Sequence, residues 1–433
     1  MRLTLINQFY VPDLSPTAHL CASLAEHRAA LGDRVTVVTG RAGYLGAMGQ
    51  ATDDGLVDVR RIWTTQLGSR TKARRFIDWI TFYISALKEA ASLPPQEVVI
   101  AMTTPPFIAW AGALHKMLNP RTRLILWNMD CWPDTAERLN MIRTGGLASR
   151  ALRGVNRALL QMVDHVVCLD QAMANLLLSQ YAPRGRALPW SIIPNWERAS
   201  LFPRQNLGDR WSSPVTDRLN GRFVVLYLGN AGYGHEFQTM IDAAQELHDE
   251  PITFLFVGGG SQFDWIREQI RSHGLTNIVL HDYVPKPQTP GVMRSANCAL
   301  ITLEDYAMGV MSPSKLHANL AMGLPVIYVG PAGGNVHEAL DRFGCGVSIR
   351  SGQTDTLVSA LRGLSNNEVM QNELRSRARR AFEQAYCDTQ TLPQFDAVLD
   401  FATRREGQAT AEPHVPPPQI SVRGERRTPR PPV

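Results

Sequence analysis

Short apolar runs alternate with amphipathic stretches along most of the chain. The first cycle has an apolar run at residues 3–6, a helical pattern at 18–31 and a β-branched run at 35–39. Gly32 follows the helical pattern, as is typical of a helix end. The pattern therefore predicts a strand, a helix and a second, parallel strand. Later runs that are apolar on both faces, as in strands covered by helices, are residues 97–101, 123–127 and 165–169.

The alternation stops at a linker and then starts again. Residues 191–211 are rich in polar and turn-forming positions. The second series has predicted strands at residues 223–228, 253–257, 278–281, 298–302 and 325–329, and predicted helices at 236–248, 262–273, 290–295 and 313–322. Such alternation predicts an α/β protein with two doubly wound, Rossmann-like domains that face a central cleft. In such sheets, ligands bind beyond the carboxyl ends of the strands.

A length of 433 residues is enough for two such domains. We expect a first domain over residues 1–195, a linker over 196–215 and a second domain over 216–387. Residues 404–433 carry +3 of the formal net charge of +5 and contain seven prolines. Such a segment buries too little apolar surface to fold, so we expect a disordered tail over 405–433. The rest of the chain is nearly neutral, which argues against nucleic acid as a partner.

The composition excludes several classes of protein. Hydrophobic residues make up 44% of the chain, so it is not disordered throughout. The six cysteines form no Cys-x-x-Cys pair, and no His-x-x-x-His or Asp-x-Asp pair indicates a metal. No run approaches the roughly 18 apolar residues of a spanning helix, and the first apolar run is too short for a signal peptide. We therefore expect a cytoplasmic protein without a metal or cofactor.

Residues 70–84 combine basic and aromatic side chains. Arg74 and Arg75 come directly before Phe76, and Trp79 follows in the same helical stretch. This mixture is typical of a helix that lies on a membrane surface, and these four residues would make the contact. A buried helix behind a solvated basic loop has the same pattern, so both interpretations stay open.

The segment 309–316 contains the strongest candidate for binding an anion. Ser312 can cap a helix and Pro313 suits its first position, which places Ser314 and Lys315 in the first turn. Cations normally avoid this positive end of the helix dipole, but an anion such as a diphosphate would stabilise a lysine there. The alternative is a lysine that extends into solvent.

A glycine-rich turn is predicted at residues 228–235, between a strand and a helix. Gly229 and Gly232 would let the backbone approach a phosphate, and Asn230 and His235 could donate hydrogen bonds to it. The turn lacks the G-x-G-x-x-G pattern of dinucleotide sites. A purely structural turn is therefore the alternative.

Two loops of the first half also follow predicted strands. The loop at residues 7–17 should face the same cleft. The loop at 128–134 carries Asp130 and Asp134, which could position substrate hydroxyls or transfer protons. Asp134 has a structural alternative as the cap of a helix that begins at Thr135. Asp130 is therefore the preferred functional carboxylate.

Eight segments carry a resemblance to a known family. They are Asn-Gln-Phe-Tyr-Val-Pro-Asp (7–13), Thr-Thr-Pro-Pro (103–106), residues 126–134, Ile-Pro-Asn-Trp (193–196), Leu-Gly-Asn-Ala-Gly (228–232), Phe-Val-Gly-Gly-Gly (256–260), Pro-Ser-Lys-Leu (313–316) and Gly-Leu-Pro-Val (323–326). In order and spacing, over about residues 1–390, the set resembles the family 4 glycosyltransferases of the GT-B fold, especially the bacterial polysaccharide branch. In that fold, a last helix, here at 388–404, crosses back to the first domain.

The resemblance implies metal-independent transfer of a sugar from a nucleotide-diphosphate-sugar, with UDP favoured and with retention at the anomeric carbon. The expected catalytic residues are Asp130 and Lys315, since fixed positive charge assists departure of the nucleotide diphosphate. Donor contacts are expected from Gly229, Asn230, Gly232, His235, Gly258, Gly259, Asp282, Tyr283, Ser314 and Lys315. Acceptor contacts are expected from Pro12, Asp13, Ser15, Thr17 and Thr104. The acceptor would be a glycan or a polyprenyl-diphosphate sugar.

The chain departs from the family pattern at four positions. Asn230 and His235 stand where many members have the Arg and Lys that contact the diphosphate. Many members carry two glutamates eight positions apart, where this chain has Val310 and Ala318. Glu304 or Glu338 could supply the missing hydroxyl contacts. A nucleotide-sugar 2-epimerase of the same fold and a non-catalytic nucleotide-sugar-binding protein are the alternative functions. A lipid-linked acceptor would place the first domain against anionic lipid at the inner face of the plasma membrane.

Overall fold

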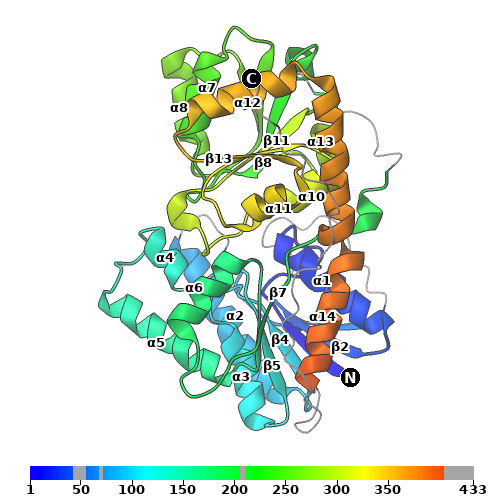
Figure 1. Ribbon diagram of the computed structural model, residues 1–433. Coiled ribbons are helices and arrows are strands. Elements are labelled where there is room, and N and C mark those ends of the chain that lie inside the picture. The colour runs from blue at the N-terminus through cyan, green and yellow to red at the C-terminus, as the bar shows by residue number, and fades with distance from the viewer. Residues whose placement is uncertain (42–54, 68–71, 205–210, 214, 404–433) are drawn as a thin grey trace, which may run out of the picture. The chain divides into compact units, whose positions relative to one another are not determined.

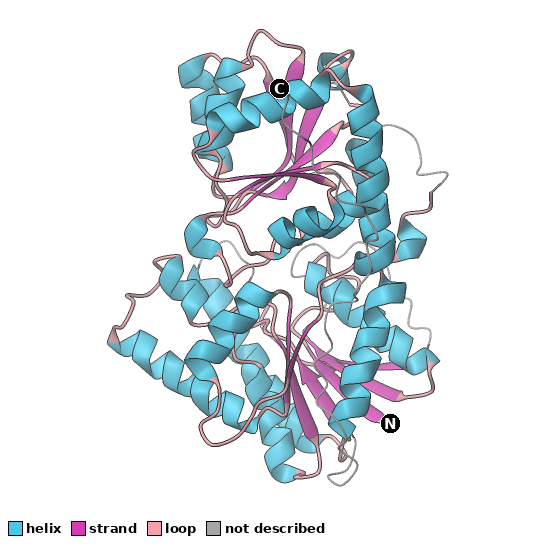
Figure 2. Ribbon diagram, viewed as in Figure 1, coloured by secondary structure: helices cyan, strands magenta, loops and turns pink. Residues whose placement is uncertain are grey.

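Two parallel β-sheets organise the chain. The computed structural model describes residues 1–41, 55–67, 72–204, 211–213 and 215–403. Both sheets belong to one compact unit, Met1–Thr403, and helices cover both faces of each sheet (Figure 1, Figure 2). The α/β class and the two Rossmann-like sheets are confirmed. The predicted tail at 405–433 lies outside the described residues.

The first sheet has seven strands in the order β3-β2-β1-β4-β5-β6-β7, and every recorded pairing is parallel. Its strands are β1 (Arg2–Ile6), β2 (Arg34–Thr39), β3 (Val57–Arg61), β4 (Val98–Ala101), β5 (Arg123–Trp127), β6 (His165–Cys168) and β7 (Trp190–Ile192). The helices between them are α1 (Pro16–Ala30), α2 (Lys72–Ser92), α3 (Ala109–Leu118), α4 (Asp134–Arg138), α5 (Leu147–Met162) and α6 (Gln171–Tyr181).

The strand β7 lies where the sequence predicts the beginning of the linker. Val166 to Cys168 of β6 pair with Trp190 to Ile192, so these three residues complete the first sheet. A strand of three residues between Pro189 and Pro194 carries too little apolar pattern to be recognised. The chain leaves the first sheet only after this strand.

The second sheet has six strands in the order β10-β9-β8-β11-β12-β13, again in parallel pairs. Its strands are β8 (Phe223–Asn230), β9 (Ile252–Gly259), β10 (Ile278–His281), β11 (Cys298–Thr302), β12 (Val326–Val329) and β13 (Gly346–Ile349). Its helices are α7 (Gln238–Glu246), α8 (Phe263–His273), α9 (Thr289–Arg294), α10 (Lys315–Ala321), α11 (Asn335–Phe343), α12 (Thr354–Ser365) and α13 (Glu368–Ala381).

The last helix, α14 (Asp388–Thr403), packs against elements of the first sheet. Asp396 accepts hydrogen bonds from His27 and Arg28 of α1, at 2.9 and 2.7 Å. Phe395 packs edge-on against Trp127 at the end of β5, with ring centres 4.6 Å apart. The C-terminal helix thus returns to the first sheet.

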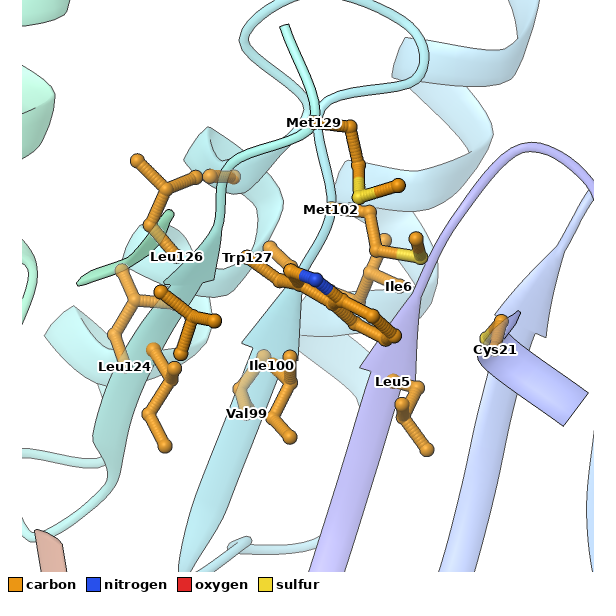
Figure 3. Close-up of a cluster of buried hydrophobic side chains, with 14 of the residues drawn as sticks. Leu5, Ile6, Cys21, Val99, Ile100, Met102, Leu124, Leu126, Trp127 and Met129 are labelled. Atoms are coloured by element: carbon orange, nitrogen blue, oxygen red, sulfur yellow. The ribbon is translucent and has the colours of Figure 1, made fainter. Parts of the chain in front are cut away.

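The core of the first sheet surrounds the Trp127 side chain. Its indole is fully buried and stacks on Trp196 at 5.6 Å between ring centres. Figure 3 shows it among Ile6, Ile100 and Met102, which come from β1, from β4 and from the residue that follows β4. This packing fixes the carboxyl end of β5, from which the loop with Asp130 begins.

Candidate functional site

The end of β8 and the beginning of α10 bring Lys315 against the glycine-rich turn. Strand β8 continues through Gly229 and Asn230, two residues beyond the predicted end. The Lys315 ammonium donates a hydrogen bond to the Asn230 carbonyl oxygen at 3.2 Å. It also lies 4.8 Å from the centre of the Tyr227 ring, whose face attracts cations. The structure thus brings together the two segments that the sequence singles out.

The Lys315 side chain is partly buried, and none of the described residues gives its ammonium a counter-charge. Burial lowers its pKa from 10.5 to about 8, and no carboxylate offsets this effect. A buried charge is costly unless an opposite charge compensates it. An anion that enters this site would therefore be bound strongly, and a diphosphate fits that requirement.

The predicted cap of α10 is wrong. The helix begins at Lys315, and Ser314, whose side chain makes no capping hydrogen bond, takes the cap position expected for Ser312. Pro313 therefore precedes the helix, and its fixed φ shapes the approach to the helix instead of the first turn. Ser314 still adjoins Lys315, as expected for a donor-binding residue.

His235 is neutral in this site. Its Nδ1 lies 2.8 Å from the Thr302 carbonyl oxygen, which can only accept, so Nδ1 carries the proton. Burial, and then the charge of Lys315, lower the pKa of His235 to about 3. Because Nδ1 donates to Thr302, the neutral ring has no N–H group left for the hydrogen bond to a phosphate that the sequence predicts. Its Nε2 is instead an acceptor, suited to a hydroxyl group.

Three glycines let the ends of β8 and β9 approach Lys315 and each other. A Cβ on Gly229, where φ is +119°, would lie 3.2 Å from Cε of Lys315. A Cβ on Gly258 would lie 2.1 Å from the Gly229 carbonyl oxygen, so Gly258 permits close strand pairing. A Cβ on Gly259 would lie 2.8 Å from the Tyr283 ring. Gly229 and Gly259 therefore border the site, whereas Gly258 serves the sheet.

The other predicted donor residues lie at the same ends of the strands. The Tyr283 hydroxyl is 3.5 Å from the Asn230 Oδ1, at the limit of a hydrogen bond. Gly232 leaves room for the Asn230 amide, which would be 3.1 Å from a Cβ there. Asn230, Asp282 and Tyr283 are exposed, so their side chains are available to a ligand.

Glu304 lies beside the turn, whereas Val310 and Ala318 offer no polar group. The Glu304 amide donates to the Gly234 carbonyl oxygen at 2.9 Å. Burial, and then the charge of Glu236, raise the pKa of Glu304. Glu338 lies on α11, where burial and then Asp170 raise its pKa. The contact with the turn makes Glu304 the better candidate for holding a sugar hydroxyl.

Asp130 borders a pocket beyond the carboxyl ends of β4 and β5. The pocket is lined by Met102, Thr103, Phe107, Ala109, Leu126, Asn128, Asp130, Trp132, Asn156 and Leu159. The Thr103 hydroxyl accepts hydrogen bonds from the amides of Met129 and Asp130, at 3.0 and 3.1 Å. Burial raises the pKa of Asp130 from 3.8 to about 6, against the opposing charge of Arg75. Such a carboxyl group can exchange a proton near neutral pH.

Thr103 lies in the site, whereas the sequence analysis names its neighbour Thr104. Thr104 offers its carbonyl oxygen to the amide of Gln8 at 2.9 Å. Thr103, not Thr104, lines the pocket and holds the Asp130 loop. Both threonines follow β4 outside the strand, so the local backbone conformation decides which one faces the pocket.

Asp134 does not cap a helix. It is the first residue of α4, and its carboxylate accepts hydrogen bonds from Arg153 at 2.8 Å and from the Tyr181 hydroxyl. This network holds α4 against α5 and α6. Asp134 therefore has a structural role, as predicted, but through its contacts with Arg153 and Tyr181 and not as a helix cap.

The predicted acceptor loop leads into α1. Asp13 is buried, and its amide donates to the Tyr10 carbonyl oxygen at 3.0 Å. The Ser15 and Thr17 hydroxyls are 2.9 Å apart, and Pro12 is partly exposed. None of these residues lines the Asp130 pocket.

The described residues show neither a metal site nor a membrane-spanning helix. No group of three or more His, Cys, Asp or Glu side chains among them could hold a metal ion. No helix in the same part of the chain is long and apolar enough to cross a membrane. All six cysteines are buried and free.

Two family models match consecutive parts of the chain. Residues 17–196 match the glycosyl transferase 4-like domain, and residues 211–381 match the glycosyl transferases group 1. WcaI of Escherichia coli, assigned to colanic acid biosynthesis as a glycosyl transferase, is 22% identical over 377 residues, which cover 84% of this chain and 91% of WcaI.

Solved structures share the fold at low sequence identity. Sucrose-phosphate synthase from Thermosynechococcus elongatus aligns with a TM-score of 0.69 and 14% identity, over 93% of this chain and 100% of that one. HepE from Anabaena, solved with UDP and glucose, aligns with a TM-score of 0.66 and 15% identity, over the same shares of the two chains.

Proposed function

Because the chain belongs to the family 4 glycosyltransferases of the GT-B fold, we propose that it transfers a sugar from a nucleotide-diphosphate-sugar to a glycan or polyprenyl-linked acceptor in cell-surface polysaccharide synthesis. A UDP-sugar is the favoured donor, because HepE was solved with UDP and with UDP-glucose. The assignment of WcaI to colanic acid biosynthesis supports a polysaccharide product. The proposal includes retention at the anomeric carbon and no metal.

The uncompensated charge of the partly buried Lys315 is the observation that carries this proposal. When the bond between the anomeric carbon and the diphosphate breaks, the leaving nucleotide gains negative charge. A fixed cation at that position stabilises the transition state more than the ground state. Lys315 has no counter-charge of its own, so it is free to do this.

The acceptor hydroxyl would lie at the Asp130 pocket. Its oxygen forms the new bond to the anomeric carbon, and its proton must leave. With a pKa of about 6, Asp130 is largely ionised at pH 7 and can accept a hydrogen bond from that hydroxyl. Phe107 and Trp132 offer apolar ring surface to the faces of a sugar.

We further propose a cytoplasmic protein that binds peripherally to the inner face of the plasma membrane through α2. Arg74, Arg75 and Phe76 are exposed, and Trp79 is partly exposed. Basic residues attract anionic lipid headgroups, and exposed apolar side chains enter the interface.

The substitution of Lys315 tests the donor site. We expect Lys315→Ala to weaken UDP binding at least about tenfold in calorimetry, since hydrogen bonds to charged groups contribute about 1.5–3 kcal/mol. Lys88→Ala, which removes an exposed lysine of α2, is the matched control. Equal affinity of both variants would rule out the assigned role.

A further inference from the structure

Helix α4 holds the segment at residues 304–314, which leads into α10. The Arg138 guanidinium, in the last turn of α4, donates hydrogen bonds to the carbonyl oxygens of Met308 and Tyr306, at 2.6 and 3.2 Å. A rigid guanidinium that joins two carbonyl groups of one loop restrains the path of that loop. Helix α4 follows the loop that carries Asp130, so a helix of the first sheet restrains a segment of the second.

Helix α6 fastens the same segment closer to Lys315. Asp170, the cap residue of α6, is 3% exposed and accepts a hydrogen bond from the Ser312 side chain. Gly309, at a φ of +75°, passes so close to α6 that a Cβ there would lie 3.0 Å from the Ala172 carbonyl oxygen. Two helices of the first sheet therefore hold the segment along much of its length.

The segment in turn holds the glycine-rich turn of the donor site. The Tyr306 hydroxyl donates a hydrogen bond to the Tyr233 carbonyl oxygen, and the Glu304 amide donates to the Gly234 carbonyl oxygen at 2.9 Å. A Cβ on Gly234 would lie 2.7 Å from the Met311 Sδ, so the turn and the segment are in close contact. A continuous path of hydrogen bonds therefore leads from α4 to the turn.

This path bears on donor binding because the turn and the beginning of α10 form the candidate donor site. Binding costs less free energy when the groups that receive a ligand are ordered before it arrives. Binding groups also need neighbours that hold them in place. Arg138 does not line the Asp130 pocket, and its described hydrogen bonds go to the segment, so we expect it to act on a donor through that segment.

We propose that Arg138 and Tyr306 are positioning residues for the donor site. Arg138 fixes the segment from the side of α4, and Tyr306 passes this restraint to the turn at Tyr233. The turn then keeps its binding geometry only while α4 stays in contact with the segment. This inference rests on the proposed function, but it makes donor binding depend on a residue of the first sheet's helices.

Hydrogen exchange of the full chain without ligand, followed by mass spectrometry, tests the restraint itself. We expect Arg138→Met to speed exchange at least about threefold in peptides that cover 229–236 and 304–311, because released amides open more often. Tyr306→Phe should speed exchange in the first of these peptides alone, since it breaks the path after the segment. Arg143→Met, at an exposed arginine that follows α4, is the matched control and should change neither. Unchanged exchange of the turn in Arg138→Met would overturn the inference.

The affinity for UDP tests whether the restraint serves the donor site. We expect Arg138→Met and Tyr306→Phe each to weaken UDP binding at least about threefold in calorimetry. The double variant should lose no more than Arg138→Met alone, because both changes break one path. Arg138→Lys, which keeps one donor for the Met308 carbonyl group, should lose less than Arg138→Met. Losses that multiply in the double variant would show two independent effects and contradict the path.

The two measurements separate this inference from the proposed function. If the unmodified chain does not bind UDP, the proposed function fails, whereas the exchange of the turn still shows whether Arg138 restrains it. Faster exchange in Arg138→Met together with unchanged UDP affinity would overturn the positioning role and leave the proposed function intact.

Discussion

At the scale of single residues, the candidate site contains charges that the fold compensates only in part. Lys315 is partly buried and has no carboxylate partner among the described residues, and Asp130 borders a pocket where burial raises its pKa. Each group lowers the stability of the folded protein when no ligand is present. Natural chains tolerate such groups mainly where function requires them.

Asp130→Asn should stabilise the folded protein and impair transfer. A pKa raised from 3.8 to about 6 means that the folded state holds the proton more tightly than the unfolded state. The contribution of Asp130 to the free energy of unfolding is therefore most favourable below pH 3.8 and falls as the pH rises to about 6. Each pKa unit corresponds to about 1.4 kcal/mol. Partial solvent contact reduces the effect, so we expect a gain of about 1–3 kcal/mol at pH 8.

Urea denaturation of the variant at pH 4.5 and pH 8 measures this effect. The gain should be larger at pH 8, whereas Asp400→Asn, at an exposed carboxylate of α14, should change stability by less than about 0.5 kcal/mol at both. A loss of stability at pH 8 would show that the ionised carboxylate makes favourable contacts in the fold.

At the same scale, the sequence predicts which residues lie in the site better than it predicts their hydrogen bonds and orientation. The Pro-Ser-Lys segment and the glycine turn identify Lys315 and Gly229 because each local pattern is unusual. Local pattern could not reveal that His235 donates from Nδ1 to Thr302, because that contact joins residues 67 positions apart. It also could not separate Thr103 from Thr104, because the choice depends on the backbone conformation of the segment after β4.

At the scale of elements, helix α2 has both a buried face, as in a core helix, and an exposed apolar face, as in a helix on a membrane surface. Phe82 and Ala86 are fully buried, whereas Phe76 and Ile84 are exposed. The helix therefore packs against the sheet through one face and leaves an apolar, partly basic face uncovered. A core helix and a surface helix are therefore not alternatives here, since α2 has the features of both.

Charge reversal tests membrane binding by α2. We expect sedimentation with vesicles to require anionic lipid and to fall at least about threefold in Arg74→Glu/Arg75→Glu, because each basic residue near such a surface contributes about 1 kcal/mol. Arg143→Glu/Arg150→Glu reverses two exposed arginines outside α2 and should sediment like the unmodified chain. Sedimentation that ignores lipid charge would contradict the proposed membrane contact.

Elements were predictable where a strand is long and apolar. Strands β1, β5 and β11 lie within a residue of their predicted bounds because each is a run of buried side chains. Strands β3, β7 and β13 were missed, since β3 carries two arginines and one aspartate, β7 has three residues and β13 has only one buried side chain. Edge strands are short and polar, so the pattern of a buried strand does not mark them.

At the scale of the whole molecule, the alternation of strands and helices was sufficient to predict two parallel sheets. The return of α14 to the first sheet followed only from the family resemblance. The structure explains this return by the Asp396 contacts with His27 and Arg28 and by the packing of Phe395 on Trp127. These contacts join residues more than 250 positions apart, so they produce no periodic pattern in the sequence.

Donor binding at this site depends on the positive charge of Lys315, and the pH dependence of UDP affinity tests that charge most directly. The phosphates of UDP are ionised throughout pH 7.5–9.5, since the last proton leaves near pH 6. With a Lys315 pKa of about 8, calorimetry should show affinity falling at least about tenfold from pH 7.5 to pH 9.5. Lys315→Arg, whose guanidinium stays charged, should change less than about threefold. A fall of equal size in both proteins, or in neither, would contradict the claim that Lys315 holds the diphosphate.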